Sequence, residues 1–157
     1  MFSNQYTHSV DSKGRLALPA RWLRELGASV FITRGLDGCL FLFPADRFHA
    51  LARDIAQLGF IKSDARALSR YLFSEALDHR LDRQGRISLP PNLLAFAGIE
   101  REVTIVGANN RIEIWNPQRY ADEDAKVTSQ VSAMSERISD LLLRTPAAEP
   151  RKRAASL

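Results

Sequence analysis

The stretch His8-Ser-Val-Asp-Ser-Lys-Gly-Arg-Leu-Ala-Leu-Pro19 recurs 71 residues later as His79-Arg-Leu-Asp-Arg-Gln-Gly-Arg-Ile-Ser-Leu-Pro90. Eight positions in and just after this repeat are identical: His8/His79, Asp11/Asp82, Gly14/Gly85, Arg15/Arg86, Leu18/Leu89, Pro19/Pro90, Leu23/Leu94 and Gly27/Gly98. At an offset of 73 the similarity continues, with 30–32 matching 103–105 and 40–44 matching 113–117. Each copy is about 40 residues long, which is too short to close a hydrophobic core without a disulfide, a metal or a partner. We therefore expect the two copies to share one core.

Composition excludes several classes of protein. The only cysteine is Cys39, so neither an intramolecular disulfide nor a zinc site with paired-cysteine spacing is expected. A chain of 157 residues with 45% hydrophobic content is typical of one globular domain. Because the sequence contains no run of 18 apolar residues and no basic-then-apolar N-terminal segment, it predicts neither a membrane span nor a secretory signal. We expect a cytoplasmic protein.

The charge of the chain is carried mainly by arginine. The net charge is only +4, but 18 of the 22 cationic residues are Arg and four are Lys. The planar guanidinium suits phosphate groups and guanine edges better than the lysine ammonium does. A compositional bias of the genome would explain the same excess equally well, so the positions of the arginines must decide between the two.

The repeated stretch predicts strand, tight turn, strand. An Asp at the first turn position can accept backbone hydrogen bonds, and a Gly at the fourth tolerates positive φ, which indicates a hairpin with a Gly bulge. Side chains alternate between the faces of a strand. In the first copy this puts Leu16 and Leu18 on the core face and Arg15 and Ala17 on the outer face. In the second copy, Ile87 and Leu89 face the core, and Arg86 and Ser88 face outward.

The rest of each copy predicts a short helix and two further strands. Pro19 opens the first short helix and Gly27 closes it as a left-handed cap, as Pro90 and Gly98 do in the second copy. Strands follow at 30–33 and 40–43, and at 103–106 and 112–115. Helical spacing of apolar residues predicts helices at 46–58, at 64–74 and from Pro117 onward, where residues 127–143 form an amphipathic stretch that needs a partner surface.

These elements predict a mainly β fold: a pseudo-two-fold barrel formed by interleaving the two copies, with peripheral α-helices. The expected organisation is repeat 1 at 5–47, a helical linker at 48–75, repeat 2 at 76–119, a C-terminal helix at 120–143 and a disordered basic tail at 144–157.

Arg15 and Arg86 are the principal candidates for a binding role. Each lies at the exit of a turn, four residues after Asp11 or Asp82. Turn chemistry alone accounts for Asp11, Gly14, Asp82 and Gly85, which we expect to shape and orient the motif. An exposed ion pair contributes only about 0–1 kcal/mol, so stability is a poor reason for the same Arg in both copies.

Two further cations belong to the same turns. Lys13 and Arg83 are expected to lie near a bound nucleic-acid backbone. Solvated surface charge is an equally good interpretation of both.

The doubled motif resembles the MraZ family. The resemblance rests on Met1-Phe2, on the two Asp-x-x-Gly-Arg-hydrophobic-x-hydrophobic-Pro units and on a length near 150, and it covers about residues 1–143. It implies tandem AbrB-like swapped-hairpin domains and a family DNA-contacting motif that falls on Asp11/Arg15 and Asp82/Arg86. It further implies a transcriptional regulator that binds double-stranded DNA with direct repeats upstream of the division and cell-wall gene cluster, including its own promoter. A ring-like homo-oligomer and nucleoid association are also implied. Ser3-Asn4-Gln5-Tyr6 departs from the family pattern, and the Arg-Lys-Arg tail lies beyond the resemblance.

Other functions remain as alternatives. An antitoxin-like AbrB regulator would have one hairpin domain and a toxin-binding tail, whereas this chain has a fused pair. A scaffold protein whose arginines bridge subunits would form the same kind of oligomer but would not bind DNA. The sequence lacks a nucleophile elbow, a Gly-rich phosphate loop and a Cys/His cluster with ligand spacing, so we predict no enzyme, no cofactor, no metal and no small-molecule substrate. His8 and His79 occupy equivalent sites without ligand spacing, and Cys39 is expected to be a buried apolar residue.

Overall fold

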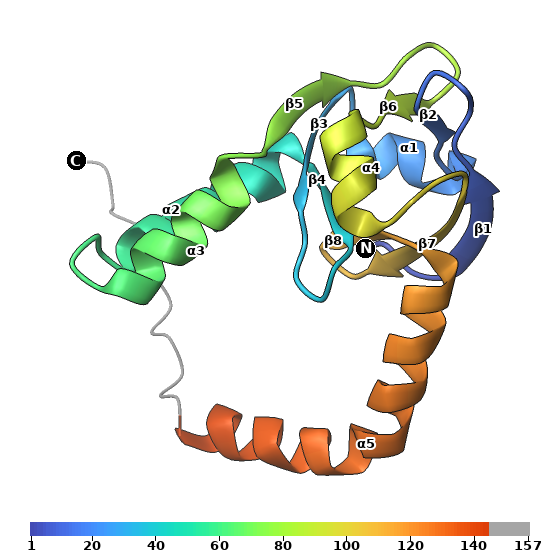
Figure 1. Ribbon diagram of the computed structural model, residues 1–157. Helices are drawn as coiled ribbons and strands as arrows, with labels where there is room; N and C mark the ends of the chain where they lie inside the picture. The colour runs from blue at the N-terminus through green and yellow to red at the C-terminus, as the bar shows by residue number, and fades with distance from the viewer. Residues whose placement is uncertain (145–157) are drawn as a thin grey trace, which may run out of the picture. The chain divides into compact units, whose positions relative to one another are not determined.

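Eight strands and five helices are formed by residues 1–144, the part of the chain that the computed structural model describes (Figure 1). The strands are β1 (Gln5–Ser9), β2 (Arg15–Ala17), β3 (Ser29–Arg34), β4 (Leu40–Pro44), β5 (Leu77–Arg80), β6 (Arg86–Ser88), β7 (Glu102–Ala108) and β8 (Arg111–Trp115). The helices are α1 (Ala20–Leu26), α2 (Ala45–Gln57), α3 (Ser63–Phe73), α4 (Pro91–Ala97) and α5 (Pro117–Arg144). Met1–Ala121 form one compact unit, and the described residues from Asp122 onward belong to another. The expected basic tail lies outside the described residues, apart from Arg144.

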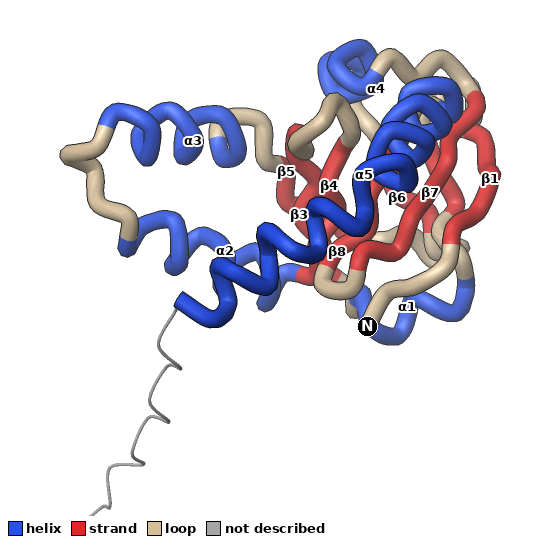
Figure 2. The backbone as a smooth tube through the Cα atoms, turned by 90° about the horizontal axis from the view of Figure 1, so that it is seen from below, coloured by secondary structure: helices blue, strands red, loops and turns tan. Residues whose placement is uncertain are grey.

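Strands from the two copies are interleaved. The six-stranded sheet has the order β1-β7-β8-β4-β3-β5, and β2 pairs with β6 in a separate two-stranded ribbon. In every pairing except β3–β4 and β7–β8, one strand comes from each copy, and all of the pairings are antiparallel. When each strand is replaced by its counterpart in the other copy, the same order is obtained in reverse. This symmetry confirms the pseudo-two-fold, shared-core arrangement (Figure 2).

The expected barrel is not closed by hydrogen bonds. β1 and β5 are the two edges of the six-stranded sheet, and the β2–β6 ribbon stands apart from it. The fold is therefore an open sheet with a ribbon and several helices.

The local hairpin predicted around each turn is also shorter than expected. The strand pairing between the two arms of the first hairpin is limited to the Val10–Leu16 bridge, because β1 continues along β7 and β2 along β6. Leu16 and Ile87 face each other across the ribbon and are both fully buried. Exchanging the arms between copies thus lets each ribbon strand bury its apolar face in the shared core, which one copy could not supply.

The change of offset from 71 to 73 has a simple structural origin. Two residues separate α1 from β3, whereas 98–101 separate α4 from β7. Ile99, in this longer connection, is buried. The second copy therefore lengthens a loop without disturbing the strand register.

The predicted strand alternation is confirmed. Leu16, Leu18, Ile87 and Leu89 are buried in the main core together with Trp22 of α1. A second, aromatic cluster joins α2 to the sheet, where Phe48 stacks on Phe31 with ring centroids 4.3 Å apart. Cys39 is buried in this cluster, as expected, and burial raises the pKa of its thiol.

The two short helices end differently. Gly98 is a left-handed cap with φ 63° and ψ 33°, as predicted. Gly27 has φ 72° but ψ −165°, so the prediction of a left-handed helical cap is wrong there. Because α1 is followed by the shorter connection, its chain must turn directly into β3.

Several apolar side chains are exposed. At the end of the α2–α3 hairpin, Phe60 is 81% and Ile61 is 84% exposed. Along α5, which begins at Pro117 and includes the amphipathic stretch in one helix, Ile138 and Leu141 are exposed. None of the described helices combines the length and apolar character that a membrane crossing requires.

Candidate nucleic-acid interface

The first turn has the geometry that its sequence predicts. The Gly14 N–H donates to the Asp11 carbonyl at 3.0 Å, and the Asp11 N–H donates to the Arg15 carbonyl at 2.9 Å. Gly14 has φ +77°, which completes a type I turn with a Gly bulge.

The Asp11 carboxylate both shapes this turn and holds the arginine. Its Oδ1 accepts the N–H groups of Lys13 and Arg15, each at 2.9 Å. Its Oδ2 accepts Nε–H of Arg15 at 2.7 Å. Because this ion pair uses Nε, the two terminal NH₂ groups of the guanidinium remain free to meet another acceptor.

The second turn repeats this arrangement. Asp82 Oδ1 accepts the N–H groups of Gln84 at 2.8 Å and Arg86 at 2.9 Å, and Oδ2 accepts Nε–H of Arg86 at 2.7 Å. Gly85 has φ +72°. The same carboxylate-to-guanidinium orientation therefore occurs in both copies.

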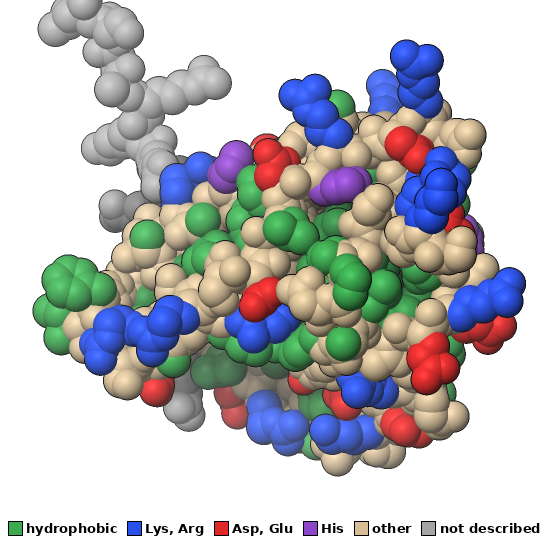
Figure 3. Space-filling view, turned by 45° about the horizontal axis from the view of Figure 1, so that its top comes forward, with side chains coloured by type: hydrophobic (Ala, Val, Ile, Leu, Met, Phe, Trp, Pro, Cys, Tyr) green, Lys and Arg blue, Asp and Glu red, His purple; other side chains and the backbone are tan. Residues whose placement is uncertain are grey.

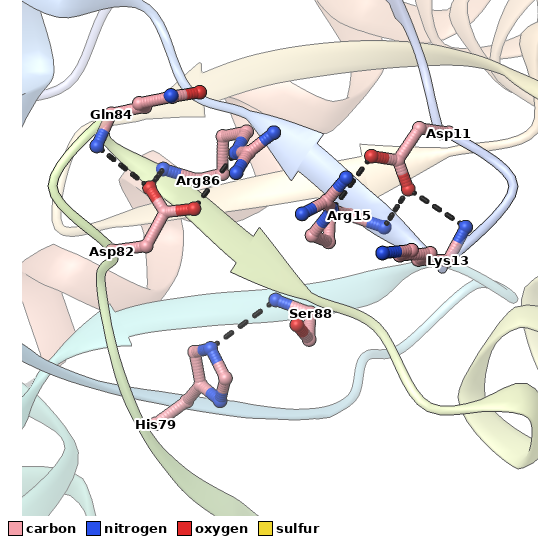
Figure 4. A network of polar contacts seen from close by, with 8 residues as sticks. All are labelled: Asp11, Lys13, Arg15, His79, Asp82, Gln84, Arg86 and Ser88. Carbon is pink, nitrogen blue, oxygen red and sulfur yellow. Dashed lines mark hydrogen bonds and ion pairs between the residues drawn. The ribbon is translucent and has the colours of Figure 1, made fainter.

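The β2–β6 ribbon brings the two arginines to one face. Its register pairs Arg15 with Ser88 and Ala17 with Arg86. Residues directly opposite each other in an antiparallel pair point to the same face, and so do residues two positions apart on one strand. All four side chains therefore lie on one face of the ribbon, and Leu16 and Ile87 lie on the other. Figure 4 shows Arg86 and Arg15 on adjacent strands, between Asp82 on one side and Asp11 on the other.

Hydrogen bonds at the ribbon ends set the spacing of these pairs. The Leu18 N–H donates to the Gly85 carbonyl at 3.1 Å, and the Leu89 N–H donates to the Gly14 carbonyl at 2.8 Å. Because hydrogen-bonded and non-hydrogen-bonded pairs alternate, the two outward pairs are of the non-hydrogen-bonded kind, in which facing side chains are closest. Each copy's turn is thus attached to the other copy's strand.

The outer face is accessible. The side chains of Arg15 and Arg86 are 33% and 25% exposed, and Lys13 and Arg83, in the turns themselves, are exposed. In Figure 3, Lys and Arg side chains stand out from the end of the molecule where Figure 1 places the two turns. The structure therefore gathers all four predicted cations around one ribbon.

The aspartates are held in their charged form. In both turns the backbone hydrogen bond from the arginine lowers the pKa of the carboxyl group most, and the arginine side chain lowers it further. Both carboxylates consequently stay ionised and able to orient the guanidinium well below neutral pH.

Two residues that the sequence did not assign to the ribbon support its edges. His8 Nδ1 donates to the Ala17 carbonyl at 2.8 Å, and His79 Nε2 accepts the Ser88 N–H at 3.2 Å. In non-hydrogen-bonded pairs the backbone N–H and carbonyl groups point away from the partner strand. The two imidazoles therefore hydrogen-bond backbone groups that have no partner within the ribbon. The recurrence of histidine at the repeat offset was the signal for this role. Among residues 1–144, no group of three His, Cys, Asp or Glu is placed to hold a metal ion.

Comparison with known proteins gives one consistent result. The chain matches the family described as "MraZ protein, putative antitoxin-like" twice, over residues 1–71 and 72–142. It is 42% identical over 140 residues to the "Transcriptional regulator MraZ" of Moorella thermoacetica, covering 89% of this chain and 98% of the relative. The proteins of the same name from Natranaerobius thermophilus and Limosilactobacillus reuteri are 42% and 45% identical, covering 89% and 76% of this chain and 98% and 84% of the relatives.

Proposed function

Because the chain belongs to the MraZ family, whose relatives carry the name transcriptional regulator, we propose that it regulates transcription by binding DNA through the outer face of its β2–β6 ribbon. The observation that carries the proposal is the convergence of Arg15 and Arg86 on that face, each oriented by its own carboxylate.

The ribbon suits the major groove of B-form DNA. The groove is about 12 Å wide and admits a two-stranded β-ribbon. An arginine that approaches base edges with its terminal NH₂ groups forward can donate two hydrogen bonds to O6 and N7 of guanine. Arg15 and Arg86 are diagonal neighbours across the ribbon, at a spacing of about 7–8 Å, so they would reach nearby but different base pairs.

The turns on either side of the ribbon supply contacts of another kind. Lys13 and Arg83 project from exposed turn positions, where they would neutralise phosphates and set the position of the ribbon on the duplex. Asp11, Gly14, Asp82 and Gly85 maintain the turns and the arginine orientation.

A single ribbon contacts few base pairs, so affinity requires several ribbons. We infer a ring-like homo-oligomer that engages direct repeats in double-stranded DNA, since linked sites gain affinity through effective concentration. The exposed Leu58, Phe60 and Ile61 at the end of the α2–α3 hairpin support self-association. In line with the family resemblance, the target would be the DNA upstream of the division and cell-wall genes, including the protein's own promoter. A protein bound there would be associated with the nucleoid in the cytoplasm.

The test is the affinity of Arg15→Ala and Arg86→Ala for the DNA upstream of the protein's own gene, measured over a range of salt concentrations. Loss of a bidentate guanine contact costs about 1–3 kcal/mol, which corresponds to a loss of affinity of roughly 5- to 150-fold. Lys13→Ala should instead reduce the log-log salt slope by about 0.9 per lost phosphate contact. Arg53→Ala, which removes an exposed arginine from α2, is the matched control.

The same variants separate DNA binding from a scaffolding role. If Arg15→Ala dissociated the oligomer, the arginine would be a subunit contact. Unchanged DNA affinity in both arginine variants, with the oligomer intact, would refute the proposal.

A further inference from the structure

The outer face of the ribbon carries two small residues beside the two arginines. Ala17 faces Arg86 across the strands, and Ser88 faces Arg15. Both small residues are exposed. They occupy equivalent positions in the two copies, but one offers a methyl group and the other a hydroxyl group. The pseudo-two-fold symmetry of the arginines is therefore broken by their nearest outward neighbours.

We propose that Ala17 and Ser88 are specificity-determining residues that make the ribbon read the two halves of its DNA site differently, Ala17 through the C5-methyl group of a thymine and Ser88 through a hydrogen bond to a base edge. The proposal rests on the proposed function of the ribbon. It goes further in that it gives the ribbon one preferred direction on the DNA, which the two symmetry-related arginines alone would not impose.

The backbone places both residues as firmly as the arginines. Each belongs to a non-hydrogen-bonded pair, where Cα atoms on the two strands are about 4.5 Å apart. His8 holds the Ala17 carbonyl, and His79 holds the Ser88 N–H. A base pair that an arginine reaches therefore has the small residue of the opposite strand beside it.

The side-chain chemistry limits what each residue can recognise. The methyl group of an alanine that faces the major groove favours thymine over other bases through apolar contact with the thymine methyl group. A serine hydroxyl instead donates or accepts a hydrogen bond at a base edge. Because Ala17 and Ser88 are small, neither keeps the neighbouring guanidinium from the groove.

The differences between the two turns are expected to act on a different part of the DNA. Lys13 corresponds to Gln84, and Ser12 to Arg83, but all four lie in the turns. Contacts from such positions to phosphates fix orientation and carry no base information. The asymmetry of base preference is thus expected to follow residues 17 and 88.

The experiment compares the wild-type chain with Ala17→Ser, Ser88→Ala and the double exchange. Each binds duplexes of the protected element from upstream of its own gene, in which base pairs are varied singly and thymines are replaced singly by deoxyuridine. Ala67→Ser and Ser63→Ala, at exposed positions of α3, are matched controls. The exchanged residues are exposed, so all variants should retain the wild-type circular dichroism and melting temperature.

At one thymine we expect deoxyuridine to weaken wild-type binding by about fourfold, the effect of one buried methyl group, and to leave Ala17→Ser unaffected. The double exchange should move the two base preferences to the opposite halves of the site. Binding that still depends on Arg15 and Arg86 but shows the same base preferences in all variants would overturn this inference and leave the proposed function standing. Wild-type binding that is absent, or indifferent to both arginines, would instead overturn the proposed function.

Discussion

Asp11 and Asp82 each perform two tasks with the two oxygens of one carboxylate. Oδ1 accepts backbone N–H groups within the turn, and Oδ2 accepts Nε–H of the arginine. A turn needs only the first set of bonds. The second set fixes the direction of the guanidinium, and its presence in both copies is what separates these turns from ordinary surface turns.

Asp11→Asn and Asp82→Asn should separate the two tasks. The Asn Oδ1 can still accept the turn bonds, but Nδ2 donates and cannot accept from the arginine Nε. We expect a folded protein whose ratio of specific to non-specific DNA affinity falls by about fivefold, the lower end of the value of one bidentate base contact. The measurement is competition binding against the specific element and random duplex, with Asp64→Asn on α3 as the control.

The change in charge alone would have the reverse effect on the DNA affinity of these variants. Removing a carboxylate next to DNA reduces repulsion, so overall affinity would rise if orientation were unimportant. An unchanged or increased specificity ratio would therefore count against the orienting role.

Acid should remove the contribution of these carboxylates to stability. Their pKa is lowered in the folded state, first by the backbone hydrogen bond from Arg15 or Arg86. A group of this kind stabilises the fold above its unfolded pKa of about 3.9 and loses that contribution as pH falls through the lower, folded pKa. Urea unfolding from neutral pH down to about pH 2 should show a smaller acid-dependent loss in the Asp11→Asn/Asp82→Asn double variant than in the wild type. Equal losses would contradict the assignment.

At the scale of elements, each turn is completed by the strand of the other copy. The Leu89 N–H donates to the Gly14 carbonyl, and a Cβ added at Gly14 would lie 2.8 Å from the Leu89 carbonyl oxygen. Glycine is thus needed at this position for its positive φ and for the close approach of another chain segment.

Gly14→Ala and Gly59→Ala should distinguish these two needs. Both glycines have φ +77°, but a Cβ at Gly59 would meet nothing within 4 Å. We expect Gly59→Ala to reduce the free energy of unfolding by about 1 kcal/mol from backbone strain, and Gly14→Ala to reduce it by at least about 2 kcal/mol. Urea denaturation measures both. Equal losses would mean that the ribbon moves to accept the methyl group at little cost.

The turn and its alternation were predictable because they depend on residues close together in the chain. An interleaving of the two copies was expected, but the individual strand pairs were not predictable, because Val10, Leu16 and Ile87 satisfy a local hairpin pattern as well as an exchanged one. The hydrogen bonds of His8 and His79 to the ribbon backbone were not predicted for the same reason. Whether a histidine reaches a backbone group depends on where another strand lies.

In the whole molecule, the end of the α2–α3 hairpin is one of the strongly exposed apolar surfaces, together with Leu141, Leu142 and Leu143 near the end of α5. Phe60 and Ile61 are 81% and 84% exposed, and Leu58 beside them is 53% exposed. Contiguous apolar exposure of this kind is typical of an interaction surface.

Replacing this surface should uncouple assembly from DNA contact. We expect Phe60→Ser/Ile61→Ser to give a smaller species in sedimentation, to bind one isolated DNA element like wild type, and to lose about a hundredfold or more on tandem elements. Leu36→Ser makes the same polar change at an apolar side chain that is 50% exposed in the loop between β3 and β4, and serves as the comparison. A variant of wild-type size with full avidity would show that assembly uses another surface.

The amino-acid sequence alone predicts that two copies of one unit share a core, that each carries a Gly-bulge turn, and that an arginine leaves each turn on the outer face. Those features follow from the repeat, from turn chemistry and from strand periodicity, none of which requires knowledge of which strands pair. The tertiary structure added that the six-stranded sheet stays open, that β2 pairs with β6 along its whole length, and that Arg15 and Arg86 lie on one ribbon face beside Ala17 and Ser88. Pairing between strands 71 residues apart is chosen by burial of the shared apolar face, and that burial exists only once both copies are folded together.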